Sequence, residues 1–238
     1  AALLGLVDDY FNVRRIGPHG GGIRFRHRLW LYAAVAAVGA WWFYFKLDWQ
    51  VLHIPFYGDV MLGWWYIPVF ILIIVGTSFS VNQTDGLDGL AGGTLLTSFG
   101  AFAAIAFLQG RFDLAALCGA IIGALLAFLW WNINPAKFFM GDTGVMALGV
   151  TLGIVAMFVN QPLLLPIIGI VFVIEALSTI VQMLSKKIRK KKIFLSSPIH
   201  HHLEATGWGE GTIVMRFWVI SIVAAGLGMI IALLDMAR

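Results

Sequence analysis

Long apolar runs interrupted by three short polar segments constrain this chain more than any other feature of its sequence. Of its 238 residues, 60% are hydrophobic and 12% are charged, and its mean hydropathy is +0.89. Soluble domains are nearer half apolar and a quarter charged. The apolar runs are continuous rather than alternating, and most are long enough for a membrane-crossing helix of roughly 20 residues. The sequence therefore predicts an all-α, polytopic transmembrane helix bundle.

Seven full spans and the end of one more are predicted. The end of the additional span is the apolar stretch at residues 1–7, whose beginning is absent, so we expect preceding spans to be missing. The whole chain, 1–238, is expected to form a single integral-membrane domain. The seven predicted spans cover residues 29–45, 61–79, 94–108, 113–131, 145–159, 163–184 and 213–235.

The basic residues predict the orientation of these spans. Alternate loops assign residues 8–28, 80–93, 132–144 and 185–212 to one side. Of the 16 Lys and Arg residues, only Lys46, Arg111 and Arg238 fall on the other side, which leaves 13 on the first, counting Arg216 just inside the last span. Basic residues gather on the cytoplasmic side of membrane proteins. The net charge of +4 thus reports orientation and not nucleic-acid binding, and the polar segments are expected to open to the cytoplasm.

One basic run stands directly after a predicted span, at Lys186–Lys192. It can anchor the span at anionic lipid headgroups, where each basic residue contributes about 1 kcal/mol. The alternative is a direct part in capturing an anionic substrate.

The first polar segment contains Asp8 and Asp9. Neighbouring side chains on a helix diverge by about 100°, so the two carboxylates should differ in role. We expect one to face a site while the other caps a helix or pairs with Arg14 or Arg15. Carboxylates close together also raise one another's proton affinity, which suits a general base. A solvated loop start is the alternative.

The second polar segment, residues 82–93, contains Asp85 and Asp88. These residues lie three apart and share a face if the segment is helical. Such a pair suits a hydrated Mg²⁺, which binds one or two carboxylates together with phosphate oxygens. The alternative is helix capping, with Thr84 or Asp85 as the N-cap.

The third polar segment runs from Asn132 to Gly144. In it, Lys137 is a candidate phosphate ligand and Asp142 a candidate metal ligand. Phe138 or Phe139 could stack on a base. The alternatives are an N-cap role for Asp142 and interfacial burial for the two phenylalanines.

Three successive histidines, His200, His201 and His202, follow the basic run. Tetrahedral zinc sites usually take ligands that are separated along the chain, and no cysteine is near. Contact with a phosphate or substrate is the favoured interpretation. Glu175, within a predicted span, is either a proton relay or a hydrogen-bonded packing residue. On the opposite side, His53, Asp59 and Asp235 are expected to be solvated.

These segments carry a family resemblance. The strings Asp8-Asp9-Tyr10, Asn82–Ala91, Asn132–Gly144 and Pro198–Glu204 resemble the polyprenyl-phosphate hexose-1-phosphate transferases. Within that superfamily the last two are most similar to the phospho-N-acetylmuramoyl-pentapeptide transferases. The resemblance implies ten spans, of which this chain would hold spans four to ten and the end of the third. The sequence of this chain departs from the family pattern at Phe79-Ser80 and at Val145.

The resemblance implies an Mg²⁺-dependent enzyme of peptidoglycan synthesis. Its reaction would transfer phospho-MurNAc-pentapeptide from UDP-MurNAc-pentapeptide to undecaprenyl phosphate and give lipid I and UMP. Its location would be the bacterial inner membrane, with the active site facing the cytoplasm and membrane lipid around the bundle. A homodimer is left open.

The resemblance also implies roles for the aspartates. Asp142 would be the principal Mg²⁺ ligand, and Asp85 would lie at the diphosphate and metal. Asp8 would be a base on the lipid phosphate, or the nucleophile of a two-step reaction, with Asp9 in support. Asp88 would lie near the uridine.

The remaining implied contacts concern the substrate. Phe139 would stack on uracil, with Asn132 beside it. Further members of the implied substrate-binding set are Asn82, Lys137, His200, His201 and His202.

Two alternatives come from the same residues. A transferase of the same superfamily that uses UDP-N-acetylglucosamine would share most of the motifs. A cation- or proton-coupled transporter would use Glu175 and the paired aspartates as relays, although these aspartates gather at one predicted surface and not at the midplane.

Overall fold

The computed structural model describes residues 1–17 and 22–238, so residues 18–21 of the predicted loop 8–28 lie outside the described part. The chain divides into two compact units. Unit 1 comprises residues 1–82, 140–163 and 234–238, and unit 2 comprises residues 83–139 and 164–233. Each unit is described by itself.

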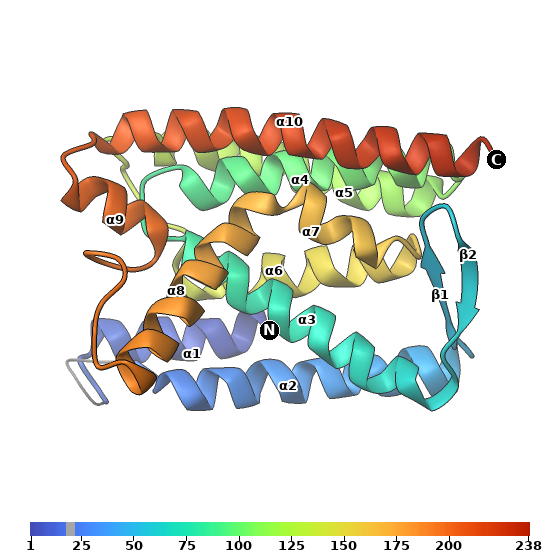
Figure 1. Ribbon diagram of the computed structural model, residues 1–238, viewed down its shortest axis with the longest axis horizontal. Helices are drawn as coiled ribbons and strands as arrows, with labels where there is room; N and C mark the ends of the chain where they lie inside the picture. The colour runs from blue at the N-terminus through green and yellow to red at the C-terminus, as the bar shows by residue number, and fades with distance from the viewer. Residues whose placement is uncertain (18–21) are drawn as a thin grey trace. The chain divides into compact units, whose positions relative to one another are not determined.

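Unit 1 contains helices, one small hairpin and most of α3. Figure 1 labels these elements along the chain. Its elements are α1 (Ala2–Val13), α2 (Phe25–Trp41), the π-helix η2 (Trp42–Lys46), strands β1 (Val51–Ile54) and β2 (Gly58–Met61), the 3-10 helix η3 (Gly63–Trp65), α3 (Tyr66–Thr84) and α6 (Gly141–Phe158).

Unit 2 contains helices only within its described residues, and α10 extends beyond it into the last segment of unit 1. Its elements are α4 (Leu90–Leu108), α5 (Phe112–Asn132), α7 (Leu165–Ile168), α8 (Ile170–Ile188), α9 (Ile199–Ala205) and α10 (Glu210–Met236). The short η4 (Pro162–Leu164) precedes α7.

The core of unit 1 forms along one face of α3. Tyr66, Phe70 and Ile74 recur every four residues, as on one stripe of a helix, and all three are fully buried. Two glycines of α6 allow that helix to approach α3 closely. A Cβ at Gly149 would lie 2.9 Å from the Ser78 Cα, and one at Gly153 would lie 2.8 Å from the Ile74 side chain. Small residues of this kind let membrane helices pack through backbone contact.

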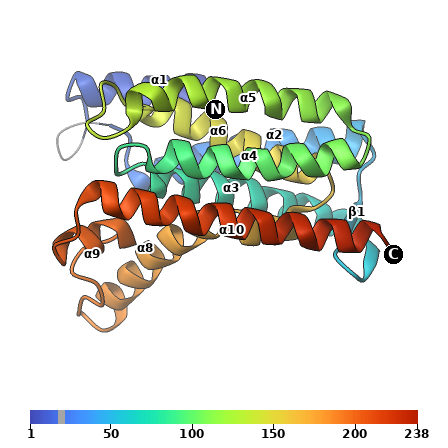
Figure 2. The ribbon, with the colours of Figure 1, turned by 90° about the horizontal axis from the view of Figure 1, so that it is seen from above.

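Unit 2 is organised around α4, which is buried on nearly all sides. Figure 2 shows α4 between α5 and α10. On one side Gly92 leaves room for the Leu129 side chain of α5, and on the other Gly93 leaves room for the Trp218 indole of α10. That indole donates a hydrogen bond from Nε1 to the Gly89 carbonyl, at 3.1 Å. An apolar helix without a polar face thus occupies the interior of its unit.

The predicted fold class, a polytopic all-α bundle, is confirmed. Within the described residues, five helices are long and apolar enough to cross a membrane, or six if one bent pair is a single span. The predicted span 163–184 is that pair, which bends by 82° at Gly169 between α7 and α8. The predicted span 29–45 is the 17-residue α2 followed by the π-helix η2.

The hairpin of unit 1 carries a charged network that corrects one prediction. His53 lies opposite Asp59 in the β1–β2 register, and its Nδ1 is 2.6 Å from the Asp59 carboxylate. Its Nε2 is 2.6 Å from Asp235, whose other oxygen accepts the Phe56 backbone N–H. The His53 backbone N–H in turn donates to the Asn160 side chain. The prediction that His53, Asp59 and Asp235 are solvated is therefore wrong for His53 and Asp235.

The stability of unit 1 should depend on pH through His53. Burial lowers the pKa of this imidazole, but its hydrogen bonds to Asp59 and Asp235 outweigh burial and hold the pKa above 6.5. The protonated ring is therefore favoured in the folded state. Its contribution is fully present below about pH 6.5 and is lost as the pH rises through the raised pKa. The unfolding temperature of the purified protein should fall across that window.

The measurement is a thermal unfolding series from pH 5 to pH 9 in detergent. His53→Gln should flatten the fall, because a glutamine does not gain a charge in this range. His27→Gln, which changes an exposed histidine, is the matched control and should keep the wild-type pH dependence. Identical pH profiles for His53→Gln and the wild type would contradict the assignment.

Candidate active site

Asp8, in the middle of α1, is a buried carboxylate with partners on both oxygens. Its side chain is 1% exposed. Oδ1 accepts the backbone N–H of Ile23 at 2.7 Å, and Oδ2 lies 2.6 Å from Nε of Arg28. A carboxylate removed from water in this way is stable only when a counter-charge and hydrogen bonds accompany it.

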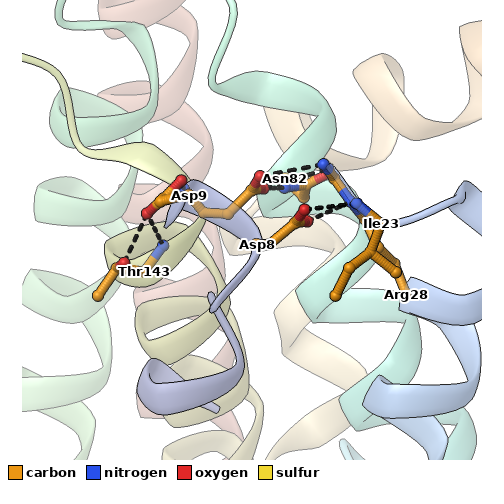
Figure 3. A network of polar contacts seen from close by, with 7 residues as sticks. Asp8, Asp9, Ile23, Arg28, Asn82 and Thr143 are labelled. Atoms are coloured by element: carbon orange, nitrogen blue, oxygen red, sulfur yellow. Dashed lines mark hydrogen bonds and ion pairs between the residues drawn. The ribbon is translucent and has the colours of Figure 1, made fainter. Parts of the chain in front are cut away.

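Arg28 extends from Asp8 to a second carboxylate, Asp142, at the start of α6. Its Nη1 and Nη2 lie 3.2 Å and 3.1 Å from the two Asp142 oxygens, so the guanidinium binds this carboxylate through both arms. Asn82, near the end of α3, donates from Nδ2 to Asp142 Oδ1 at 2.7 Å. Figure 3 shows these contacts converging from separate helices. Two carboxylates face one guanidinium, so the cluster keeps an excess of negative charge.

Asp9 points away from Asp8 and caps helix α6 (Figure 3). Its Oδ1 accepts the Asp142 backbone N–H, and its Oδ2 accepts the backbone N–H of Thr143, each at 2.9 Å. The Thr143 hydroxyl also donates to Oδ2. A carboxylate at a helix N-terminus satisfies otherwise unpaired N–H groups and is favoured by the helix dipole.

The predicted divergence of Asp8 and Asp9 is therefore confirmed, and so is the capping alternative for Asp9. The alternative pairing with Arg14 or Arg15 is not taken by Asp9, because both of its oxygens bind the start of α6 and Arg14 lies over the Tyr10 ring.

Glycines bring α1 and α6 together around this cap. A Cβ at Gly5 would collide with the Asp142 carbonyl and the Thr143 Cα. Gly141 has φ +65°, which favours glycine, and a Cβ there would lie 2.9 Å from the Asp9 carboxylate. The site of unit 1 thus depends on two positions where a side chain has no room.

In unit 2, Asp88 holds the loop that follows α5. Its Oδ2 accepts the Asn134 side-chain N–H at 3.2 Å and the Ala136 backbone N–H at 2.9 Å. Glu210, at the start of α10, accepts the Asp88 backbone N–H at 2.8 Å and a second bond from Asn134 at 2.8 Å. The side-chain amide of Asn134 therefore donates to both Asp88 and Glu210.

Asn132 connects the same two loops from the end of α5. It is 6% exposed, its Oδ1 accepts the Gly89 N–H, and its Nδ2 donates to the Phe138 carbonyl, each at 3.0 Å. In this structure Asn132 fixes backbone and presents little surface to a ligand.

Three other predicted site residues of unit 2 are exposed. Asp85 lies in the turn between α3 and α4. Phe139 is 72% exposed, and the Nζ of Lys137 lies 4.5 Å from the centroid of the Trp131 ring. Phe138 is 46% exposed and packs edge-on against Phe128, so both phenylalanines lie at the protein surface.

The three histidines occupy α9 and differ in exposure. His200 is fully buried, and its Nδ1 lies 2.9 Å from Glu175 Oε2. His201 is partly exposed and pairs with Glu204 at 2.6 Å, and His202 accepts the Leu195 N–H. Only His201 and His202 present an imidazole at the surface of this unit.

The capping alternatives for the second polar segment are wrong in detail. Thr84 ends α3, and α4 begins at Leu90 after Gly89, which adopts a left-handed conformation. Asp85 and Asp88 therefore lie in the intervening turn. Asp142 is the second residue of α6, where the cap is supplied by Asp9 and not by Asp142.

The residues of unit 1 fit a hard divalent cation. Among the described residues no group of three or more His, Cys, Asp or Glu side chains is placed to hold a metal ion. Mg²⁺, however, is usually bound through one or two carboxylates plus waters and phosphates. Asp8 and Asp142 already bracket one cationic group, the Arg28 guanidinium, with oxygen ligands of the preferred kind.

The sequence interpretation missed several residues that build these sites. Arg28 was counted only for topology, and its sequence context does not distinguish it from Arg26, which is exposed. Thr143, Asn134 and Glu210 stand next to predicted site residues or span starts, but their partners are distant in sequence. Nothing local in the sequence pairs them.

Comparison with known proteins shows the class to which this fold and these carboxylates belong. The sequence model of Glycosyl transferase family 4 matches residues 1–160. The chain therefore belongs to that family and is a membrane-embedded transferase with multiple spans.

Individual relatives show to which group within the family the chain belongs. The phospho-N-acetylmuramoyl-pentapeptide-transferase of Chloroflexus aurantiacus is 44% identical over 248 residues, covering 98% of this chain and 67% of the relative. That of Pelagibacter ubique is 40% identical, covering 95% and 68%. That of Geobacillus sp. is 43% identical, covering 96% and 70%. Within the family, the chain is a member of the phospho-N-acetylmuramoyl-pentapeptide transferases.

Removing the guanidinium of Arg28 should destabilise unit 1. Arg28→Met leaves Asp8 and Asp142 without their shared counter-charge, and breaking a buried ion pair in this way costs about 3–5 kcal/mol. Arg26→Met, which changes an exposed arginine of the same helix, is the matched control. Urea unfolding of the purified protein measures the difference, and equal stabilities of the two variants would contradict the bridging role.

The contribution of Asp9 to stability as the cap of α6 should be separable from the contribution of its charge. Asp9→Ala removes the acceptor for two backbone N–H groups and should cost about 1–2 kcal/mol of unfolding free energy. Asp9→Asn keeps one accepting oxygen and replaces the other with an NH2 donor, so it should recover only part of that loss. The same unfolding assay applies. Stability of Asp9→Asn equal to that of the wild type, or stability of Asp9→Ala equal to that of the wild type, would contradict a cap made by both oxygens.

Proposed function

We propose that the chain transfers phospho-MurNAc-pentapeptide from UDP-MurNAc-pentapeptide to undecaprenyl phosphate, forming lipid I and UMP with Mg²⁺. The observation that carries the proposal is the buried cluster in which Arg28 joins Asp8 to Asp142. Membership of the transferase family supports the same reaction. Phosphoryl transfer requires charge neutralisation and positioning more than covalent help, and this cluster supplies charged groups in a fixed arrangement.

Asp142 is the principal candidate to hold Mg²⁺, with Asp85 as the second and Asp8 as a neighbouring carboxylate. When bound, the ion would supply positive charge to the diphosphate. The protein contributes the orientation of Asp142, since Asn82 and Arg28 fix both of its oxygens. Ligands held by such partners keep their geometry when the substrate arrives.

For Asp8 we propose the role of base toward the lipid phosphate. In one step, an oxygen of undecaprenyl phosphate attacks the phosphorus attached to the sugar, the bond to UMP breaks, and Asp8 accepts the proton of the attacking phosphate. Asp8 is 1% exposed and both of its oxygens are engaged, by Ile23 and Arg28. Both the one-step and the two-step route therefore require an Asp8 oxygen to leave its partner when the lipid phosphate binds.

The nucleotide would be bound by residues of unit 2. Phe139 offers an exposed ring for stacking on uracil, and Lys137 is an exposed cation for phosphate. Asp88 would lie near the uridine, and Asn132 would support the same loop through Gly89 and Phe138. Of the histidines, His201 and His202 are the candidates for direct contact with substrate.

The proposed location is the bacterial inner membrane, with the site toward the cytoplasm. The distribution of basic residues supports this orientation, since 13 of 16 fall on the predicted cytoplasmic side. The acceptor dissolves in the membrane and the nucleotide in the cytoplasm. An enzyme that joins them must therefore place its charged groups where the two phases meet.

Radiolabel transfer into a lipid extract tests the reaction and its metal dependence. Label from UDP-MurNAc-pentapeptide should enter the lipid fraction in a reaction that EDTA stops and added Mg²⁺ restores. UDP-N-acetylglucosamine, supplied in a parallel reaction, should give no labelled lipid. Transfer from the second nucleotide and not the first would assign the chain to the alternative reaction of the superfamily.

The role of Asp142 has its own test. Asp142→Asn should lower Mg²⁺-dependent UMP release by about a hundredfold or more, because it removes a charged metal ligand. Its amide retains the shape of the carboxylate but loses the ion pair with Arg28, so the unfolding temperature should also fall, and turnover is measured at a temperature at which the variant remains folded. Asp113→Asn, which changes an exposed aspartate at the start of α5, is the matched control. Turnover of Asp142→Asn equal to that of Asp113→Asn would refute the metal role.

A further inference from the structure

Helix α8 carries a buried polar stripe that the proposed reaction does not use directly. Glu175, Ser178, Gln182 and Ser185 recur at intervals of three and four residues, and each is at most 5% exposed. This spacing places them on one face of the helix. Polar groups in an apolar setting are costly unless they are hydrogen-bonded, so their partners indicate what the stripe does.

The C-terminal part of the stripe, Gln182 and Ser185, binds the segment 189–198. This segment, here called the strap, leads to the histidine helix α9. Gln182 Oε1 accepts the backbone N–H groups of Ile193 and Phe194 at 2.9 Å and 3.1 Å, and its Nε2 donates to the Phe194 carbonyl at 2.8 Å. Ser185 donates to the Lys191 carbonyl at 2.9 Å. These side chains satisfy backbone that has no helical partners.

The first residue of the stripe, Glu175, binds α9 itself. Glu175 and His200 are both fully buried, and Oε2 of one lies 2.9 Å from Nδ1 of the other. Within the described residues, Glu175 Oε1 and His200 Nε2 have no hydrogen-bond partner. The orientation of the imidazole therefore depends on its single bond to Glu175.

The free edge of His200 faces the turn that carries Asp85 and Asp88. A Cβ at Gly86 would collide with His200 Nε2 and would lie 2.8 Å from its Cε1. Helix α8 meets the same segment once more, where the Thr179 hydroxyl donates to Gln83 Oε1 at 3.2 Å. The imidazole thus packs directly on the backbone between the two aspartates of the turn.

We propose that Glu175 is a positioning residue: it fixes the His200 ring, and the ring supports the turn at Gly86 so that Asp85 and Asp88 keep their places. The inference rests on the proposed function in one respect, namely that this turn meets the nucleotide substrate. It assigns His200 a supporting role and leaves direct contact to the exposed imidazoles of α9. Glu175 acts through His200 and does not touch the substrate.

Hydrogen exchange of the purified protein in detergent tests the positioning without any need for turnover. Glu175→Ala should raise amide exchange across residues 83–89 and 199–205 by about tenfold or more, since a lost buried hydrogen bond costs 1–3 kcal/mol. Glu175→Gln keeps an acceptor for Nδ1–H and should restore most of the protection. Gln182→Ala is the matched control on the same stripe and should loosen residues 191–197 while leaving 83–89 protected.

Kinetics then separate positioning from general stability. Glu175→Ala should raise KM for the nucleotide sugar by about tenfold and leave KM for undecaprenyl phosphate within about twofold, because the turn serves one substrate. Glu175→Ala/His200→Ala should be no worse than the more damaging single variant, since both act through one contact.

Three results would overturn the inference: unchanged exchange of residues 83–89 in Glu175→Ala, losses in the double variant that add up, or Glu175→Gln as damaging as Glu175→Ala. If instead the wild type fails to transfer phospho-MurNAc-pentapeptide while Glu175→Ala still loosens the turn, the proposed reaction fails and the positioning role stands.

Discussion

The two carboxylates that Arg28 joins are the constraint on which unit 1 depends. Asp8 and Asp142 lie on helices far apart in sequence, and each is too deeply placed to be solvated by water alone. A single guanidinium with five donors can reach both at once, which an ammonium of similar charge does less well. Because Asn82 binds the same Asp142 oxygen, helices α1, α2, α3 and α6 meet at one charged point. In the proposed reaction, the negative charge that remains would attract a divalent cation, and the cation would in turn neutralise a phosphate group.

Polar side chains elsewhere in this apolar protein mainly hold backbone that is not helical. Asp9 accepts the first N–H groups of α6. Asn132 accepts the Gly89 N–H and donates to the Phe138 carbonyl. Gln182 donates to the Phe194 carbonyl of the strap. Irregular backbone is tolerated near the membrane only where such partners replace water. The loops that present exposed residues such as Phe139 are therefore rigid through contacts that lie behind them.

Several features could be predicted from the sequence because they are local. Apolar runs fix the helices, and adjacency alone separates Asp8 from Asp9, since neighbouring side chains on a helix point in different directions. Other features could not. One partner of Arg28, Asp142, lies 114 residues away, and the bend at Gly169 appears in an apolar run that reads as continuous. His53 was expected to be solvated at the opposite surface, and its second partner, Asp235, is 182 residues distant, so no local pattern pairs them.

The sequence by itself determined an all-α membrane protein, its helix positions, the polar segments that carry the chemistry and the family they resemble. Hydropathy and short motifs are properties of consecutive residues, so they can be recognised without any knowledge of packing. Only the tertiary structure decided that Asp9 caps α6 while Asp8 joins the charged cluster, and that His200 is buried on Glu175 while its two neighbours are not. These distinctions arise from which buried groups find a partner, and the partner is chosen by the packing of helices that are remote in the chain.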